Sequence, residues 1–486
     1  MIVSRRHGLA AFGAVLLAAT AFACRAPGER RGAARRPNFL VILCDDLGYA
    51  DLSCYGSARI RTPHVDRLAR EGTLLTHCLA AAPVCSPSRA GLLTGRVPTR
   101  AGIHDWIARD HPMHLRAGET TVASALRDAG YATALAGKWH LNGGLEREDQ
   151  PQPSAHGFDH VFATQNNAFP SHHNPENFVR DGAPAGQLAG YSCDLVADDA
   201  IAWLESGRGS EKPFFLLVSF HEPHEPVDAP ESLVAEYLDA PERGQALYEA
   251  CVANLDRATG RLLAAIDRLA LRDDTLVFFT SDNGPEPTAR YDGAWRSHGE
   301  VGALRGRKLS VYEGGLRVPG IVRFPGRVRA GGVSDAPVSG VDLLPTLLDY
   351  AGVAPPARAL DGASARAALE GRAMAREVPL HWYYFRADGR AKAAIRDGDW
   401  KAVGLWDGPD LDPARSLQPG DAETIATTRL VEFELYDLRT DPGEAKNLAA
   451  SEPERCRAMA EKLASLTAAA IAESPRWTVP DEIPLD

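Results

Sequence analysis

Cysteine is scarce in this chain, with 8 residues among 486, and no two of them stand in the CxxC spacing of a structural zinc site. So few cysteines in so long a chain exclude a small scaffold held together by disulfides. Cys44 and Cys54 are near enough in sequence to pair in an exported protein. The sequence leaves their pairing open, and we expect no structural zinc.

The chain also lacks an excess of basic residues and lacks internal repeats. Its 53 Lys and Arg against 64 Asp and Glu give a formal net charge of -11. This balance argues against a general affinity for nucleic acid or anionic lipid, so any attraction for an anionic substrate must be local. The length and the 45% hydrophobic content fit a large globular domain with a smaller companion.

Only the N-terminus carries an uninterrupted apolar run, residues 9–23, which is too short for a comfortable membrane span. Arg5 and Arg6 precede it, so residues 1–24 are interpreted as an export signal of the twin-arginine or the Sec type. Cys24 occupies the place of a bacterial lipobox cysteine, and a lipid there would be the chain's membrane contact. We expect a protein exported to the periplasm or lipid-anchored to the cell envelope of a bacterium, with residues 25–37 as a linker.

Strand and helix patterns alternate from residue 38 to residue 372. Continuous apolar runs such as 38–43 and 213–220 are typical of strands buried on both faces of a parallel sheet. Residues 142–193 have no sustained period and predict a long irregular excursion bordering a pocket, and residues 355–376 resemble a linker. We therefore predict an α/β catalytic domain, 38–372, with a large, mostly parallel sheet between helices.

The pattern changes after residue 376. Short strand signals at 380–385, 392–397, 399–406 and 433–439 follow one another without helices between them, and a helix is expected over 454–472. Clustered strands of this kind favour a separate α+β subdomain with an antiparallel sheet, here over residues 376–486.

Polar side chains follow several of the predicted core strands. Asp45 and Asp46 come after strand 38–43, and Asp282 and Asn283 come after strand 275–280. Open α/β sheets bind ligands at the carboxyl ends of their strands, and neighbouring carboxylates need a cation to offset their repulsion. Because these donors are all oxygens, they suit Ca²⁺ best, with Mg²⁺ as the alternative.

Basic and imidazole side chains gather at the same edge. Lys138 and His140 follow strand 131–135, and the motif HEPHEP places His221 and His224 after strand 213–220. Lys308 follows the next strand along the chain. Together with Arg89, these residues predict a local positive pocket in a negatively charged protein, as an anionic ester requires.

The most specific motif is CSPSR, Cys85 to Arg89, in which a cysteine opens a predicted helix. The positive end of a helix dipole favours an anion or an oxygen nucleophile at that point. The motif matches the signature of the type I sulfatases of the alkaline phosphatase superfamily, and GYATALAGKWH, residues 130–140, is similar to their second signature. The resemblance covers nearly the whole mature chain.

The resemblance implies that a formylglycine-modifying enzyme oxidises Cys85 to formylglycine, reading Pro87 and Arg89 as it does so. It further implies a Ca²⁺ site made of the modified Cys85 with Asp45, Asp46, Asp282 and Asn283. The remaining implied roles are sulfate binding by Lys138 and Lys308, stabilisation of the formylglycine hydrate by Arg89, assistance by His140 and leaving-group protonation by His221. His224 is the alternative acid and otherwise a substrate contact.

The implied reaction is hydrolysis of a sulfate ester. One hydroxyl of the formylglycine hydrate attacks sulfur, a protonated alcohol leaves, and the second hydroxyl expels sulfate. A formylglycine-dependent phosphodiesterase or phosphonate monoester hydrolase is the nearest alternative. A non-catalytic lipoprotein that binds sulfated glycans is the second alternative.

An exported sulfatase would meet sulfated polysaccharides, so we expect a sulfated carbohydrate as substrate. Aromatic and imidazole side chains suit a sugar ring, and Trp106, His172 and His381 are candidates together with His224. Further candidates are His104, Asp105, His173 and Trp382.

Overall fold

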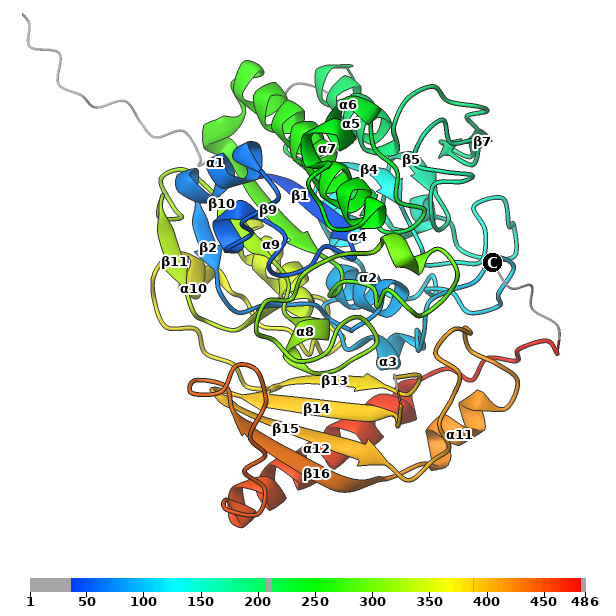
Figure 1. Ribbon diagram of the computed structural model, residues 1–486, viewed down its shortest axis with the longest axis vertical. Coiled ribbons are helices and arrows are strands. Elements are labelled where there is room, and N and C mark those ends of the chain that lie inside the picture. The colour runs from blue at the N-terminus through cyan, green and yellow to red at the C-terminus, as the bar shows by residue number, and fades with distance from the viewer. Residues whose placement is uncertain (1–35, 207–211, 388, 482–486) are drawn as a thin grey trace, which may run out of the picture. The chain divides into compact units, whose positions relative to one another are not determined.

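The computed structural model describes residues 36–206, 212–387 and 389–481 (Figure 1). From Arg36 onwards the chain forms one compact unit. The predicted export signal, the lipid at Cys24 and all but the last two residues of the predicted linker lie outside the described residues. Within those residues, no helix has the length and apolar character needed to cross a membrane.

A ten-stranded sheet has five parallel strands at its centre, in the order β9-β1-β8-β4-β5. These strands are β9 Thr275–Ser281, β1 Asn38–Asp45, β8 Phe214–Pro223, β4 Ala132–Lys138 and β5 His160–Thr164. The predicted parallel sheet is thereby confirmed.

Short strands complete the sheet at both edges. Beyond β9 come β10 Gly320–Arg323, β2 Thr73–Leu75 and β11 Gly332–Ser334, and beyond β5 come β6 Val179–Arg180 and β7 Ala183–Pro184. The strand β10 runs antiparallel to both β9 and β2, so the sheet is mixed at this edge.

Helices cover both faces of the sheet. Alternate side chains of β1 point to opposite faces, so each face has an apolar core for helices to cover. Phe39, Val41 and Leu43 belong to one core and Leu40 and Ile42 to the other. The first core is covered by α2 Cys85–Thr94, α4 Val122–Asp128 and α9 Leu343–Ala351. The second is covered by α1 Pro63–Glu71, α5 Ser192–Ser206 and α7 Arg243–Arg268.

A four-stranded antiparallel sheet lies in the C-terminal part (Figure 1, yellow to orange). Its strands are β13 Leu380–Tyr384, β14 Lys392–Asp397, β15 Trp400–Trp406 and β16 Leu430–Asp437. Helix α12 Pro453–Glu473 packs on this sheet. Trp382 and Tyr384 of β13 instead pack with Cys85 and Leu309 of the larger part, and Trp382 Nε1 donates to the Ala80 carbonyl at 2.9 Å.

Short elements fill segments that the sequence pattern left irregular. The excursion 142–193 contains β5, β6 and β7, and the stretch before β16 contains α11 Asp421–Thr427. The small parallel pair is β3 Cys78–Leu79 with β12 Val338–Ser339, and the short α-helices are α3 Pro98–Ala101, α6 Glu231–Val234, α8 Glu313–Leu316 and α10 Arg366–Leu369. The 3-10 helices are η1 Ser53–Tyr55, η2 Pro153–His156, η3 Ala235–Tyr237, η4 Arg272–Asp274, η5 Ala294–Arg296 and η6 Gly340–Asp342. Elements this short carry too few residues to display a period.

All seven described cysteines are free thiols. Cys44 is buried inside β1, and Cys54 belongs to the 3-10 helix η1, so the two side chains do not pair. The pairing that the sequence left open is thus absent among the described residues.

A buried ion cluster joins the antiparallel sheet to the segment that follows Lys308. The fully buried Lys401 of β15 contacts Glu313 of α8 at 3.0 Å and Glu444 at 2.9 Å. Burial opposes ionisation of Glu313, but Lys401, Arg317 and Arg396 hold the pKa of this carboxyl well below its usual range. Burial raises the pKa of Glu444, although the Lys401 ammonium opposes the shift, so Lys401 is the cation that offsets the burial of both carboxyl groups.

We expect Lys401→Met to destabilise the protein by about 3–5 kcal/mol, because it leaves two buried carboxylates without their shared ammonium. Lys462→Met is the matched control. It breaks a pair with Asp397 at the surface, at 3.4 Å, and is expected to cost less than about 1 kcal/mol. Urea unfolding of the two variants measures both, and equal losses would contradict this account of the cluster.

Candidate active site

The carboxyl ends of the central strands bring the predicted site residues to one edge. Asp45 ends β1, Lys138 ends β4, and Asp282 directly follows β9. His221 lies in the last part of β8, and His224 directly follows that strand. Since β9, β1, β8 and β4 are neighbours, these side chains meet as the sheet topology predicts.

Cys85 is the first residue of α2, after Val84 in an extended conformation. Every residue of α2 is buried, and the Cys85 side chain is only 2% exposed. Burial raises the pKa of the Cys85 thiol to about 11, although Lys138 and Lys308 oppose the shift. An unmodified Cys85 is therefore a protonated thiol at neutral pH and a poor nucleophile.

Arg89 lies one helical turn after Cys85 and holds three strands together. Its Nε donates to Asp282 Oδ2 at 2.9 Å, and its Nη1 donates to Ser219 Oγ at 2.6 Å and to the Lys138 carbonyl at 2.9 Å. Its Nη2 lies 3.6 Å from Asp45 Oδ2. Arg89 thus fixes the start of α2 against the ends of β9, β8 and β4.

Two lysines are paired with the two adjacent aspartates. Lys138 Nζ donates to Asp45 Oδ2 at 2.6 Å, and Lys308 Nζ donates to Asp46 Oδ2 at 2.9 Å. Each lysine has a second partner, Asn167 Oδ1 at 3.1 Å for Lys138 and Glu286 Oε2 at 3.0 Å for Lys308. Both ammonium groups are therefore held at the sheet edge.

The carboxylates at this edge are buried and close together. Burial favours the neutral form of Asp45, but the Lys138 ammonium holds the pKa of Asp45 well below its usual range. Burial raises the pKa of Asp46 to about 7 and that of Asp282 to about 6, with Asp45 adding to both shifts. Burial therefore opposes the ionisation of Asp46 and Asp282, and further positive charge beside them would favour it.

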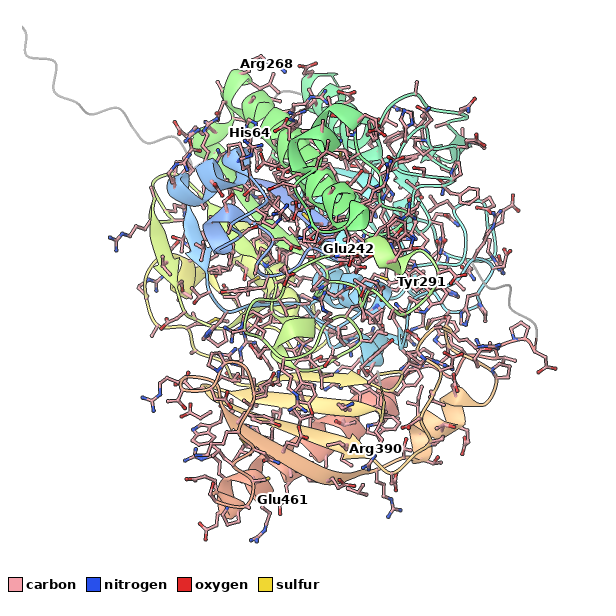
Figure 2. The ribbon with its side chains drawn as sticks, viewed as in Figure 1. His64, Glu242, Arg268, Tyr291, Arg390 and Glu461 are labelled. Atoms are coloured by element: carbon pink, nitrogen blue, oxygen red, sulfur yellow. The ribbon has the colours of Figure 1, made fainter. Side chains whose placement is uncertain are left out.

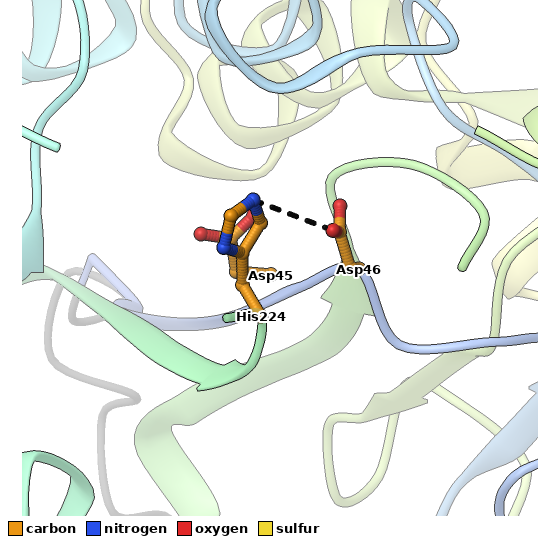
Figure 3. Close-up of side chains that lie close together, drawn as sticks. All are labelled: Asp45, Asp46 and His224. Atoms are coloured by element: carbon orange, nitrogen blue, oxygen red, sulfur yellow. Dashed lines mark ion pairs between the residues drawn. The ribbon is translucent and has the colours of Figure 1, made fainter. Parts of the chain in front are cut away.

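The same residues fit a divalent cation. Asp45 Oδ1 and Asn283 Oδ1 are buried and have no hydrogen-bond partner among the described residues. Single ligand atoms of Asp45, Asp46 and His224 lie within 4.8 Å of one another (Figure 3). The oxygen donors are the ones that the sequence predicted. The His224 imidazole lies beside them, and the sequence had not predicted it as a metal ligand.

His224 and His221 face different surroundings. His224 lines the cavity at this edge, its Nδ1 donates to the Glu225 carbonyl at 2.7 Å, and its Nε2 lies 3.5 Å from Asp46 Oδ2. His221 Nε2 is bonded to Thr164 Oγ1 at 2.7 Å, and its ring packs against Phe178. The sequence predicted His221 as the leaving-group acid, with His224 as the alternative, whereas of the two only His224 lines the cavity.

His140 also lines the cavity; it lies two residues after the end of β4 and has a φ of 57°. Its Nε2 contacts the Ile107 carbonyl at 3.1 Å and therefore carries the proton. Burial, with Lys138 adding to the effect, holds the pKa of His140 well below its usual range. The neutral ring leaves Nδ1 as an acceptor.

The cavity has a volume of about 490 Å³. It joins Cys85, His140, His224 and Lys308 to side chains that the sequence analysis did not single out. Those additional lining residues are Asn166, Asn167, Glu225, Arg290, Tyr291, Asp292 and Arg296. No pattern identified them, because they lie on loops after β5, β8 and β9 that only the fold brings together.

Of the predicted substrate contacts, Trp106 and His224 line this cavity, whereas His172 and His381 do not. His172 is fully buried behind His221, with ring centroids 6.5 Å apart. His381 is buried within β13, and its Nδ1 contacts the Pro379 carbonyl at 3.1 Å. Both imidazoles occupy core positions, so the expectation that they touch substrate is wrong for this structure.

The weaker substrate candidates also lie away from the cavity. Trp382 is bonded to Ala80, Asp105 is buried against Tyr384, and His173 stacks on Tyr191. His104 lines a separate cavity of about 610 Å³ beside α11 and α12. That larger space contains none of the charged residues at the sheet edge, so its size does not mark the active site.

Two family models match the chain. The sulfatase model matches residues 37–353, and the model of the C-terminal part of N-sulphoglucosamine sulphohydrolase matches residues 299–413. The first covers more than half of the chain and includes every residue of the charged edge.

Curated relatives agree with the family models. Human arylsulfatase A is 35% identical over 463 residues, which cover 88% of this chain and 87% of that protein. Mouse steryl-sulfatase is 32% identical over 561 residues, covering 94% and 85% of the two chains. Human N-acetylgalactosamine-6-sulfatase is 32% identical over 446 residues, covering 85% and 81%.

Solved structures share the fold. Ps i-CgsB in complex with k-i-k-neocarrahexaose is 26% identical, with a TM-score of 0.76 over 89% of this chain and 93% of that chain. The phosphonate monoester hydrolase of Agrobacterium radiobacter is 25% identical, with a TM-score of 0.63 over 90% and 96% of the two chains. The family model, the curated relatives and the shared fold together show that the chain belongs to the type I sulfatases and is a sulfuric ester hydrolase.

Proposed function

We propose that this enzyme removes sulfate from a sulfated carbohydrate, using a formylglycine made from Cys85 and a bound Ca²⁺. The observation that carries the proposal is the convergence of Cys85, Lys138 and Lys308 on the paired carboxylates Asp45 and Asp46. This edge combines a nucleophile precursor, two cations for an anionic ester and a set of oxygen donors for a metal.

The cavity lining supports a carbohydrate. Its walls offer amide, carboxylate and guanidinium groups from Asn166, Asn167, Asp292 and Arg290, together with the aromatic ring of Trp106. Asn166 Oδ1 is buried without a hydrogen-bond partner among the described residues, so a sugar hydroxyl could donate to it, whereas an apolar ring would leave it unpaired. One relative bears the name N-acetylgalactosamine-6-sulfatase and another the name steryl-sulfatase, so the names favour neither a sugar nor a sterol. The proposal of a carbohydrate substrate therefore rests on the residues that line the cavity.

Asp45, Asp46, Asp282 and Asn283 would hold the metal, through oxygens that include the two unpartnered ones. Ca²⁺ takes several oxygen ligands in flexible geometry, and Mg²⁺ demands a stricter octahedron. When present, the cation would neutralise the acidic cluster and polarise oxygens bound to it. It would thereby keep all three carboxylates ionised, including Asp46 with its raised pKa.

Formylglycine would supply, as its hydrate, an oxygen nucleophile and a second hydroxyl that allows the sulfate to be released. The protein's own residues position the reactants. Lys308, which lines the cavity, and Lys138, whose ammonium is paired with Asp45, would hold sulfate oxygens. Arg89 fixes the first turn of α2 against the sheet. His140 can accept a proton at Nδ1, since its Nε2 donates to Ile107.

His224 is the residue we propose as the acid for the leaving alcohol. Its Nδ1 donates to a carbonyl, so Nε2 is the atom that can exchange a proton with a group in the cavity. Burial and the Lys308 ammonium hold the pKa of His224 well below its usual range. A bound sulfate ester brings negative charge beside the ring and so favours the protonated form.

The alternative activity is hydrolysis of a phosphodiester or phosphonate monoester by the same groups. The likeness to a phosphonate monoester hydrolase keeps this class as the second candidate. Parallel rates on an aryl sulfate and an aryl phosphodiester separate the two activities. The non-catalytic glycan-binding alternative requires that Cys85 stay a thiol.

We also propose that the protein is exported, either to the periplasm or as a lipoprotein anchored at Cys24. Support comes from the basic and apolar pattern of residues 4–23. These residues lie outside the described part of the chain. N-terminal mass spectrometry of the protein from a bacterial envelope distinguishes cleavage without a lipid from lipidation.

Cys85→Ala is expected to abolish sulfatase turnover while leaving the melting temperature within a few degrees of the wild type, because a small side chain fits the same buried position. Turnover is followed with 4-nitrophenyl sulfate, and the Cys85 peptide of the wild type is tested for an aldehyde. Full activity of the variant, or a free thiol in active wild-type enzyme, would refute the role of Cys85.

His224→Ala is expected to lower turnover of a sulfated sugar by about 10²–10⁴-fold, the usual contribution of a general acid. The loss with 4-nitrophenyl sulfate should be much smaller, because nitrophenolate leaves without a proton. His221→Ala is the control, since it removes a buried ring bonded to Thr164 and should not discriminate between the two leaving groups. If His221→Ala shows the leaving-group dependence instead, His221 is the acid.

Ca²⁺ is expected to raise the melting temperature of the chelator-treated protein, with a weaker effect of Mg²⁺. At 100 times the dissociation constant, a ligand specific for the folded state stabilises it by about 2.7 kcal/mol. Asp282→Asn should reduce the response, and Asp51→Asn should keep it, because Asp51 is a buried carboxyl bonded to Tyr248 and not part of the donor set. Equal responses of the two variants would rule out this metal site.

A further inference from the structure

The described part of the chain has six large hydrophobic side chains that are strongly exposed. Three are aliphatic and three are aromatic, namely Phe169 at 67%, Tyr291 at 39% and Trp295 at 51% exposure. Each of the aromatic three lines the active-site cavity or lies within four residues of a side chain that does. Aromatic side chains exposed beside a pocket offer flat apolar faces on which a ligand that extends out of the pocket can pack.

Tyr291 (Figure 2) lines the cavity, and Trp295 directly precedes Arg296, which lines it too. The Trp295 ring packs over Gly244 of α7, where a Cβ would come within 2.8 Å of the ring. The Arg296 guanidinium lies 5.8 Å from the centroid of that ring and pairs with Glu225 of the cavity wall at 2.6 Å. Trp295 is thus held in place next to the cavity while half of it remains exposed.

Phe169 belongs to the loop after β5. Its backbone N–H donates to Asn177 Oδ1 at 2.9 Å, and Asn177 Nδ2 donates to the Asn167 carbonyl at 2.8 Å. Asn167 lines the cavity and accepts from Lys138. The position of Phe169 is therefore tied to a residue that touches the sulfate-binding lysine.

The two groups of aromatic side chains come from opposite sides of the site. Phe169 follows β5, and Tyr291 and Trp295 follow β9, with β1, β8 and β4 between those strands. Four spacings between neighbouring strands separate the two loops by about 19 Å where they leave the sheet. Beyond the strand ends, Phe169 lies five residues after β5 and Tyr291 ten residues after β9, and residues of both loops line the cavity.

We propose that the substrate is a chain of several sugars, bound across the cavity so that the sulfate is removed from an internal sugar. The sulfated ring enters the cavity, and neighbouring rings lay their apolar faces on Phe169 on one side and on Tyr291 and Trp295 on the other. Flat aromatic rings bury such faces at little entropic cost. This inference rests on the proposed function, and it adds chain length and position of attack to it.

The test uses size ladders of sulfated di-, tetra- and hexasaccharides from carrageenan and from chondroitin sulfate, with 4-nitrophenyl sulfate as the small substrate. The wild-type, formylglycine-containing enzyme is expected to turn over a hexasaccharide with a kcat/KM about tenfold above that of the disaccharide of the same series. Mass spectrometry should find the internal sugars desulfated before the terminal ones.

Phe169→Ala and Trp295→Ala should each lower kcat/KM for the hexasaccharide about tenfold and change that for 4-nitrophenyl sulfate less than twofold. Tyr291→Phe should retain hexasaccharide turnover, because the ring remains. Leu238→Ala is the control, since Leu238 is 73% exposed and does not line the cavity.

Two failures are distinguishable. If 4-nitrophenyl sulfate is not hydrolysed, the proposed function itself fails. If it is hydrolysed but neither saccharide series gains rate with length, or terminal sugars lose sulfate first, the extended binding surface is refuted. Equal losses on small and large substrates in Trp295→Ala would likewise refute it and assign the residue to the stability of the loop.

Discussion

The balance of buried charge at one sheet edge is the constraint on which this structure depends. Three carboxylates, Asp45, Asp46 and Asp282, lie almost without solvent, and each contacts a buried cation. Removing charged groups from water costs several kcal/mol each, which only close opposite charge can offset. The raised pKa values of Asp46 and Asp282 indicate that the protein's own cations leave the balance incomplete. A divalent cation bound between these carboxylates would complete it, and the positions of the lysines would then depend on the metal as well.

The rest of the fold keeps these charges at fixed positions. Arg89 connects α2 to three strands, and the antiparallel sheet packs against both Val84 beside Cys85 and Leu309 beside Lys308. The ion cluster around Lys401 lies under the same segment. The C-terminal sheet is therefore part of the support of the active site, which explains why residues from Arg36 onwards form one compact unit.

Substrate specificity would depend on the loops around the cavity and not on the ends of the core strands. The residues that handle charge lie at the ends of core strands, where packing leaves little freedom. The residues that can meet the substrate beyond the sulfate, such as Asn166, Arg290 and Tyr291, lie on loops. A fixed charged edge surrounded by separate loops would let one fold act on different esters, and the relatives of this chain carry varied names.

The sequence by itself determined the central sheet, because long apolar strands such as Phe214–Pro223 are recognisable without tertiary context. It also determined the charged edge, because Asp45, Lys138 and Asp282 each follow a core strand and a parallel sheet aligns such ends. Only the tertiary structure decided that His224 reaches the cavity and His221 does not. The two histidines stand three residues apart in HEPHEP, and it is the packing of Thr164 and Phe178 around one ring that separates them. The same holds for Tyr291 and Phe169, because chain folding alone sets loops from β9 and β5 around one cavity.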